Sequence, residues 1–333
     1  MITDERALPA PALSGPPLLG PALSVIVPAT GSRPCLPRCL AAIDAATWSG
    51  DQLIVVRDAP LPGPASARNQ GAAEASNEIL VFIDADVEVK PDALALLRAR
   101  FAANPELTAV FGSYDDDPEE TDAVSTFRNL LHHYVHHGAA GSVDSFWAGL
   151  GAVRRVAFEE LGGFDTRIAR ASVEDIEFGA RLSAGAGKIE LDPAIQGKHL
   201  KRWTLGTMVN TDLRRRGIPW VRLAMRGRAT SHGLNLAWRH RLSAASCVAM
   251  VLSAIWRRPT AAVASLATLC ALNQRFYRLL HRRGRWYALS GVCLHVVHHL
   301  TSVLALLIGI LGMARPPLHR LAQRAPLHRV KSW

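Results

Sequence analysis

The sequence predicts an α/β fold followed by a separate region of apolar helices. Three short runs of apolar and β-branched residues cover 23–27, 53–56 and 79–83, with helical patterns between them. Unbroken runs of this kind suit strands that are buried on both faces, as in a parallel sheet. Strands that alternate with helices predict the α/β class. The last third of the chain differs, because it contains long uncharged segments.

Each expected strand ends at a position where a ligand would be held. The first run ends at Pro28, the second at Arg57-Asp58 and the third at Asp84-Ala85-Asp86. Ligands of such sheets bind beyond the carboxyl ends of the strands. Helical patterns cover 36–46, 65–75, 92–103 and 173–184, and a further strand is expected at 189–191.

Charge divides the chain into two parts. The formal net charge is +10, but no Asp or Glu follows Asp212, whereas 20 of the 38 Lys and Arg residues do. A basic tail for nucleic acid is one interpretation. The basic residues here are interleaved with apolar runs, which favours anionic lipid headgroups instead, so we expect a membrane partner and no nucleic acid.

Three uncharged segments lie in the C-terminal region 236–333, which we expect to attach to a membrane. Segments 242–256 and 259–274 are about 15 residues each, short for the ~30 Å hydrocarbon core, and suit a hairpin that dips into the bilayer. Segment 286–314 is long enough to span it. The arginines before it favour the cytosolic side of the cytoplasmic membrane. Buried helices of a soluble protein are the alternative.

The N-terminal residues 1–22 are Pro-rich, with no sustained apolar core, and we expect a flexible tail without a signal peptide. A catalytic domain at 23–235 would then face the cytosol. Five cysteines without dense spacing argue against a disulfide framework and against a zinc site.

Asp84-Ala85-Asp86 is the central chemical motif. Two carboxylates separated by one residue at a strand end can point into one site, and Mg²⁺ or Mn²⁺ prefers carboxylates together with substrate phosphates. His199 follows the expected late strand and is a candidate third ligand. Asp58 could accept hydrogen bonds from a base or ribose, and Arg68 could offer a donor fork to a diphosphate. The alternatives are a loop Asp beside Pro60 and a surface Arg.

Glu174 and Asp175 open the expected helix at 173–184. A transfer to a hydroxyl group needs a base that takes the proton of the attacking hydroxyl. A carboxylate can serve, and Asp175 is the candidate with Glu174 as its neighbour. The alternative is that both acids stabilise the first turn of the helix.

Four histidines, His132, His133, His136 and His137, form two pairs at i, i+4 spacing on one predicted helix. Such pairs can bind a transition metal. Contact with an acceptor and plain packing are the alternatives. His295, His298 and His299 lie in the long apolar segment, and the sequence assigns no role to them.

Taken together, these motifs resemble glycosyltransferase family 2, which has the GT-A fold with a Rossmann-like mixed sheet. The matching segments run from about Leu23 to about Trp220: LSVIVPAT, LIVVRD, SARNQGA, ILVFIDADVEVKPDAL, FWAGLGAVRR, ELGGFD and VEDIEFGARL. Five further segments are similar to a membrane-associated bacterial subgroup: GSYDDDP, VSTFRNLLHHYVHH, SFWAGLGAVRR, SVEDIEFGARL and HLKRWTLGTMVNTDLRRRGIPW.

The resemblance implies a role for each part of the site. Pro28, Asp58, Arg68 and Asp84 would hold the nucleotide-sugar donor, and Asp84 and Asp86 a divalent metal on its diphosphate. Asp175 would be the base of a single inverting displacement. The acceptor side would comprise Phe146, Trp147, His133 and Trp203.

Three departures from the family pattern concern the nucleotide base and the mode of action. Thr30 stands where family members often carry a stacking aromatic residue, and Arg57-Asp58 replaces a pair of acids. RRRGIPW at 214–220 replaces the motif of processive members, which favours a single transfer.

The sequence therefore predicts an inverting glycosyltransferase that acts on a lipid-linked or membrane-near acceptor. A nucleotidyl or sugar-phosphate enzyme of similar fold is one alternative, and a catalytically silent membrane scaffold is another.

Overall fold

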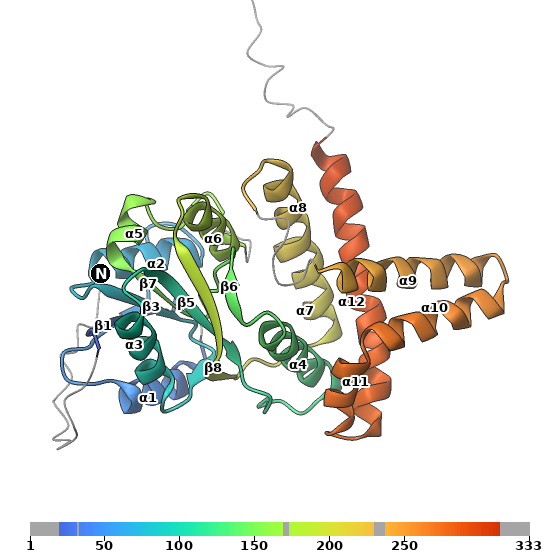
Figure 1. Ribbon diagram of the computed structural model, residues 1–333, viewed down its shortest axis with the longest axis horizontal. Helices are drawn as coiled ribbons and strands as arrows, with labels where there is room; N and C mark the ends of the chain where they lie inside the picture. Colours follow the sequence, from blue (N-terminus) through green and yellow to red (C-terminus); the bar gives the residue numbers. More distant parts are fainter. Residues whose placement is uncertain (1–19, 32, 169–172, 230–236, 314–333) are drawn as a thin grey trace, which may run out of the picture.

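The computed structural model describes residues 20–31, 33–168, 173–229 and 237–313. Most of the expected N-terminal tail, part of the linker before residue 236 and the last twenty residues lie outside these ranges. The described chain has two parts, a sheet covered by helices and a purely helical region beside it (Figure 1).

The sheet has eight strands in the order β2-β1-β3-β7-β5-β8-β4, and β6 pairs with β8. The first three strands are those that the apolar runs predict: β1 (Leu23–Pro28), β2 (Gln52–Val56) and β3 (Ile79–Ile83). They are parallel, so their carboxyl ends meet at one edge. The remaining strands are β4 (Val87–Val89), β5 (Leu107–Tyr114), β6 (Gly141–Val143), β7 (Leu150–Arg154) and β8 (Lys188–His199).

Antiparallel strands make the sheet mixed, as the family resemblance implies. β7 is antiparallel to both of its neighbours, β3 and β5, and β8 is parallel to β5. The expected short strand at 189–191 is the beginning of the long strand β8. β7 lies in the Gly-rich stretch 149–163, where Gly151 faces the backbone of Trp147 so closely that a Cβ would lie 2.3 Å from its carbonyl oxygen.

Helices cover both faces of the sheet (Figure 1). One side carries α2 (Pro64–Ala73), α5 (Arg155–Glu160) and α6 (Glu174–Ala184), and the other carries α1 (Leu36–Ala46) and α3 (Ala93–Ala103). Between the sheet and α5 and α6 lies a cluster of edge-to-face and tilted aromatic rings: Phe82, Phe146, Phe158, Phe164 and Phe178. Burial of such rings is the main stabilising contribution to this layer.

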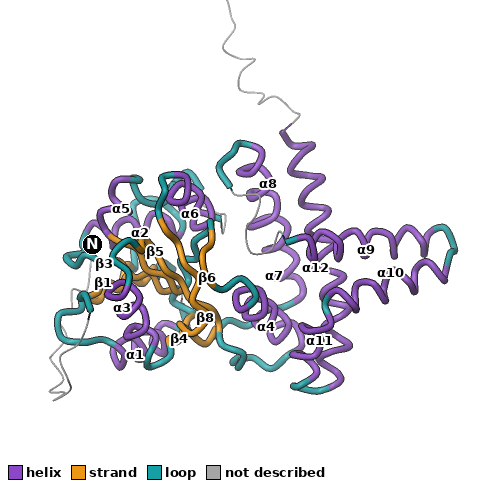
Figure 2. Tube along the Cα trace, viewed as in Figure 1, coloured by secondary structure: helices purple, strands orange, loops and turns teal. Residues whose placement is uncertain are grey.

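The helical region lies on the β8 side of the sheet (Figure 2). It begins with α4 (Ala123–His137), which Asp122 caps by accepting hydrogen bonds from the backbone N–H groups of Val124 and Ser125. After β8 follow α7 (Leu205–Asn210), a π-helical turn η1 (Thr211–Gly217) and α8 (Ile218–Met225). The C-terminal helices are α9 (Trp238–Ile255), α10 (Pro259–Leu272), α11 (Gln274–His281) and α12 (Arg285–Met313).

The two short apolar segments form the expected hairpin, in which α9 and α10 pack on each other and project away from the rest of the chain (Figure 2). α12 packs along its length against α4, η1, α8 and α9. Within the described residues, α12 is the helix that is long and apolar enough to cross a membrane, over Arg285–Gly312.

Candidate active site

The site is built at the edge where the parallel strands end. Thr30 follows β1, and Asp58 follows β2; both line a cavity of about 370 Å³ together with Gly31, Arg57, Ala59, Leu61, Pro62 and Gly63. Pro28, the last residue of β1, is buried and is not among the residues that line the cavity. The cavity therefore lies where the sequence places the nucleotide base, and it is open enough that Asp58 remains exposed.

Arg68 joins two of the predicted carboxylates. Its guanidinium donates from Nη1 to Glu174 Oε1 at 2.7 Å and from Nη2 to Asp84 Oδ1 at 2.6 Å. The Arg68 and Glu174 side chains are buried, whereas Asp84 is a third exposed. Helix α2 presents Arg68 because Gly71, on the same helix, packs against Ile26 with no room for a Cβ. Arg68 thus orients the end of β3 and the start of α6 toward each other.

Asp175 is held by the loop that contains Trp147. Its Oδ2 accepts a hydrogen bond from the backbone N–H of Ala148 at 3.3 Å, and its Oδ1 accepts one from that of Ile176 at 2.9 Å. The same loop meets the end of β3, where the Asp84 N–H donates to the carbonyl oxygen of Gly149 at 3.0 Å. One loop therefore brings Asp84 and Asp175 to the same site.

Burial and charge set the ionisation of the two acids on α6. Burial raises the pKa of Asp175, and the positive charges of Arg68 and Arg216 oppose this rise. Burial also raises the pKa of Glu174, against the charge of Arg68. A carboxylate with a raised pKa is a better proton acceptor when ionised, so Asp175 is suited to the role of a base.

Asp86 and His199 face each other across the pairing of β4 with β8. The register pairs Val87 with His199, and Asp86 Oδ2 lies 3.8 Å from His199 Nε2. Burial favours a higher pKa for Asp86, but His199, Lys201 and Arg33 hold it below its usual value. An ionised carboxylate beside an imidazole nitrogen is a suitable pair of ligands for Mn²⁺, whereas Mg²⁺ would use the carboxylate oxygen only.

These residues fit a divalent metal only as part of its coordination shell. In the described part of the chain no group of three or more His, Cys, Asp and Glu side chains is arranged around a metal position. Asp84 directs Oδ1 to Arg68, which leaves its other oxygen for a ligand. Asp86 and His199 would hold the ion, and the oxygens of a diphosphate would complete the shell.

Histidine ring nitrogens of the His-rich helix α4 contact backbone carbonyl oxygens of the neighbouring strand β5. His133 Nδ1 lies 3.0 Å from the carbonyl oxygen of Tyr114, and His136 Nδ1 lies 2.9 Å from that of Gly112. His137 Nδ1 contacts the carbonyl oxygen of His133. Burial lowers the pKa of His136 to about 3, so the ring is neutral. Of the open alternatives for these histidines, the contacts favour packing over transition-metal binding.

The expected acceptor residues divide into two groups. Phe146 is buried between Phe111 and Phe178, so it supports the site by packing only. Trp147 stands edge-on against Tyr114, and the Tyr114 ring stacks on His199 at 4.2 Å. Tyr114 was not predicted, because its role depends on β5 and β8 being neighbours.

Trp203 is the second aromatic group at the site. Lys201 Nζ lies 4.1 Å from the centre of its ring, and the Arg128 guanidinium lies 5.0 Å from it. Ser125 fixes the start of this segment, because its hydroxyl accepts a hydrogen bond from the Trp203 N–H at 2.8 Å. Lys201, Arg128 and Arg216 are functional candidates that sequence reasoning missed.

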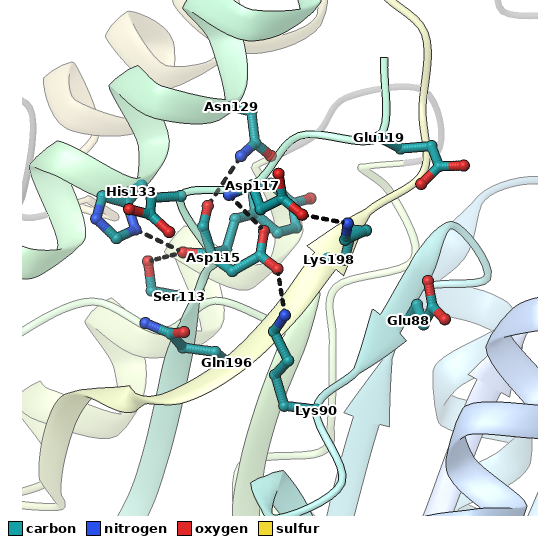
Figure 3. Close-up of polar contacts among 12 residues, drawn as sticks. Glu88, Lys90, Ser113, Asp115, Asp117, Glu119, Asn129, His133, Gln196 and Lys198 are labelled. Carbon is teal, nitrogen blue, oxygen red and sulfur yellow. Dashed lines mark hydrogen bonds and ion pairs between the residues drawn. The ribbon is translucent and has the colours of Figure 1, made fainter. Parts of the chain in front are cut away.

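The acidic loop after β5 is neutralised by basic side chains (Figure 3). Asp115 contacts Lys90 at 2.7 Å, and Asp117 contacts Lys198 at 2.7 Å. Asn129 donates to the backbone carbonyl of Asp115 and so ties α4 to this loop. The loop is therefore a junction between β4, β5, β8 and α4.

Residues 60–162 match the family described as Glycosyl transferase family 2. The chain carries a glycosyltransferase family 2 domain. It is a glycosyltransferase, and the match covers Arg68, Asp84, Asp86 and the loop at 146–149, which the geometry brings together. No curated protein matches the sequence significantly.

Three solved structures of glycosyltransferases are similar to this chain, and the first of them shares its fold. The chain is similar to the mannosyltransferase PcManGT from Pyrobaculum calidifontis, solved with GDP-Man and Mn²⁺, at 19% identity and a TM-score of 0.50 over 90% of each chain. GalNAc-T7 with UDP, GalNAc and Mn²⁺ matches at 17% identity and a TM-score of 0.42, over 58% of this chain and 47% of that one. The catalytic domain of Drosophila β1,4-galactosyltransferase 7 with xylobiose matches at 16% identity and a TM-score of 0.39, over 54% of this chain and 71% of that one.

Proposed function

We propose that this glycosyltransferase moves a sugar from a nucleoside-diphosphate donor to an acceptor at a membrane surface, with inversion at the anomeric carbon. The observation that carries the proposal is that one loop, 147–149, holds both Asp84 and Asp175, beside the parallel strand ends and the cavity at Asp58. The mannosyltransferase of the same fold, solved with GDP-Man and Mn²⁺, supports the donor class.

Each residue has one task in this mechanism. Asp58 binds the base or ribose at the cavity, and Arg68 holds Asp84 and the start of α6 in place. Asp86 and His199, with the free oxygen of Asp84, would hold a divalent metal. When bound, that metal neutralises the charge of the leaving diphosphate.

Asp175 accepts the proton. The acceptor hydroxyl oxygen forms a bond to the anomeric carbon on the face opposite the diphosphate, and the bond from that carbon to the diphosphate oxygen breaks. The hydroxyl proton moves to the Asp175 carboxylate. The products are the inverted glycoside, the free nucleoside diphosphate and the protonated Asp175 side chain.

Membrane attachment belongs to the same proposal. Exposed apolar side chains gather on the hairpin and on α12, among them Ile255, Trp256, Val263, Leu307 and Leu311. No acid follows Asp212, and arginines stand at the hairpin tip and before α12. Apolar surface edged with basic residues binds anionic bilayers. We infer that the hairpin and α12 face the cytosolic leaflet of the cytoplasmic membrane.

The test is a donor screen on the full chain in detergent, with Mn²⁺ or Mg²⁺ and a panel of UDP-, GDP- and dTDP-sugars. Metal-dependent release of a nucleoside diphosphate from one donor supports the proposal. Release of pyrophosphate instead would identify a nucleotidyl enzyme. Absence of both donor binding and release across the panel would support the silent scaffold.

A further inference from the structure

Two cations beside the active site, Lys201 and Arg216, form no ion pair with an acid among the described residues. Neighbouring cations are neutralised, since Arg128 pairs with Asp212 at 3.0 Å and Lys90 with Asp115. In the ranges that the structure describes, no carboxylate lies within ion-pair distance of Lys201 or Arg216. Lys201 is partly buried and lies on the face of Trp203. Partly buried cations without a counter-charge are costly unless an anion joins them.

Two buried N–H donors in the same region have no acceptor. The indole Nε1 of Trp203 and the Nε of Arg216 are both inaccessible to solvent and without a hydrogen-bond partner among the described residues. The Trp203 side chain is 8% exposed, so this is a nearly buried donor, and Lys201 covers its ring. Native proteins rarely leave such donors unpaired, and a ligand is one common reason.

The segment that carries Arg216 has an unusual backbone. Thr211–Gly217 forms the π-helical turn η1, a conformation that is rare and often marks a functional site. Its position is fixed on α12, because a Cβ at Gly217 would lie 2.5 Å from the Cβ of Ala305. Asp212, also on η1, contacts His298 of α12 at 2.8 Å. The turn that carries Arg216 therefore packs against α12, and through Asp212 it also pairs with Arg128 of α4.

The same cations lie within electrostatic reach of the catalytic carboxylates. The charge of Arg216 acts on Asp175 and on Lys201, and the charge of Lys201 acts on Asp86. An anion bound by these cations would therefore be near the proposed base Asp175 and near Asp86. Beyond the contacts of Ala305 with η1 and of Gly309 with α8, the side chains of α12 are exposed and apolar: Leu304, Leu307, Ile308 and Leu311.

We propose that Lys201, Arg216 and the indole N–H of Trp203 bind a phosphate group carried by a lipid acceptor, whose apolar chain lies along α12. This inference rests on the proposed function and names the acceptor class for it. The phosphate provides acceptors for the two unpaired donors and a counter-charge for the two cations. The apolar face of α12 provides a surface for the attached chain.

Binding can be measured without turnover. Isothermal titration calorimetry on the full chain in detergent would compare farnesyl phosphate, farnesol and inorganic phosphate, with Mg²⁺–GDP and Mg²⁺–UDP titrated separately. The variants are Arg216→Gln, Lys201→Gln and Trp203→Phe, which keeps a ring and removes the N–H. Arg214→Gln, an exposed arginine on the same turn, is the matched control. Thermal melts identify any variant that does not fold.

The wild type should bind farnesyl phosphate at least about tenfold more tightly than it binds farnesol. Arg216→Gln and Lys201→Gln should each lower the affinity for farnesyl phosphate about tenfold. Trp203→Phe should lower the same affinity by about threefold or more, and Arg214→Gln should leave it nearly unchanged. Equal affinities for farnesol and farnesyl phosphate would overturn the proposal. So would variants that weaken only Mg²⁺–nucleotide binding, since the cations would then serve the donor.

Failure of the proposed function looks different. Tight, Arg216-dependent binding of farnesyl phosphate without turnover of any donor would leave the phosphate site in place and reject the transfer. If Arg216→Gln does not fold, the Trp203→Phe and Lys201→Gln titrations decide the same question.

Discussion

Arg68 and Glu174 form a buried ion pair, in which the guanidinium Nη1 and the carboxylate Oε1 lie 2.7 Å apart and both side chains are 4% exposed. The two residues are 106 positions apart in sequence and come from α2 and α6. The pair fixes the start of α6, where the proposed base Asp175 lies, relative to the end of β3. It is thus the structural link between the donor side and the base.

Removing one partner of this pair should destabilise the fold strongly. We expect Arg68→Met to lower the free energy of unfolding by about 3–5 kcal/mol, because Glu174 is left as a buried charge. The double variant Arg68→Met/Glu174→Met should recover much of that loss. Urea unfolding of the three proteins at pH 7 measures both values. A double variant as unstable as the single one would show that the pair does not act as a unit.

Removing Arg216 should change the pH dependence of transfer. Its positive charge favours the ionised form of Asp175 and so opposes the rise that burial causes in the pKa of that group. In Arg216→Gln the pKa of Asp175 should therefore be higher, and the acidic limb of kcat/KM should move to higher pH by a fraction of a unit. The exposed control Arg214→Gln should keep the wild-type midpoint. An unchanged midpoint in Arg216→Gln would show that the charge of Arg216 does not act on the base.

The contact of η1 with α12 should depend on the charge of Asp212. Burial opposes its ionisation, but Arg128 and His298 hold the pKa of Asp212 below its ordinary range. A carboxylate with a depressed pKa stabilises the fold above its unfolded-state pKa of about 3.9, and this contribution is lost as the pH falls further.

Asp212→Asn should therefore cost about 3 kcal/mol of unfolding free energy at pH 7. The difference from the wild type should shrink as the pH is lowered below about 4. Urea unfolding over a pH series measures it. A difference that stays constant down to pH 2 would show that charge at Asp212 is not the cause.

The position of α6 should be sensitive to a single methyl group. A Cβ at Gly179 would lie 2.3 Å from the backbone nitrogen of Phe146, in the segment that leads to the Asp175 contact. Gly179→Ala should cost about 1–3 kcal/mol of stability and reduce turnover, since α6 must shift. Gly206→Ala is the control, because a Cβ at Gly206 would have its nearest neighbour 3.9 Å away, and it should keep the wild-type stability and turnover. Thermal melts and turnover of the two variants check this, and equal effects would contradict it.

The hairpin should determine membrane binding. Ile255 is 66% exposed beside the hairpin turn, and Val156 on α5 is 64% exposed in the catalytic domain. Ile255→Glu should weaken binding to vesicles of phosphatidylglycerol and phosphatidylcholine by about tenfold, because a charge opposes burial in the interface. Val156→Glu should bind as the wild type does. Vesicle flotation compares them, and an Ile255→Glu protein that still floats fully would show that another surface binds the lipid.

Local patterns were sufficient for the front of the fold. The first three strands, the helices between them and the His-rich helix follow from apolar runs and periodicity, and the structure places them within a few residues of the predicted bounds. The α9–α10 hairpin follows from two short apolar segments joined by Arg257-Arg258. These elements were predictable because their signals are contained in adjacent residues.

Features that depend on the sheet order were not predictable in the same way. β5 and β7 pair with each other and with strands far along the chain, and β7 begins in a Gly-rich segment that reads as a loop. The stacking of Tyr114 on His199 and the unpaired donors of Trp203 and Arg216 exist only once β8 and η1 are in place. The burial of Phe146 in the core likewise follows from tertiary packing.

The most direct test of the central claim is to measure nucleoside diphosphate release and donor affinity for the wild type and Asp175→Asn, with the active donor and Mn²⁺. The account predicts that Asp175→Asn lowers kcat by about 10²–10⁴-fold, while the donor Kd stays within about twofold of the wild type. Wild-type turnover by Asp175→Asn would contradict the assignment of Asp175 as the base.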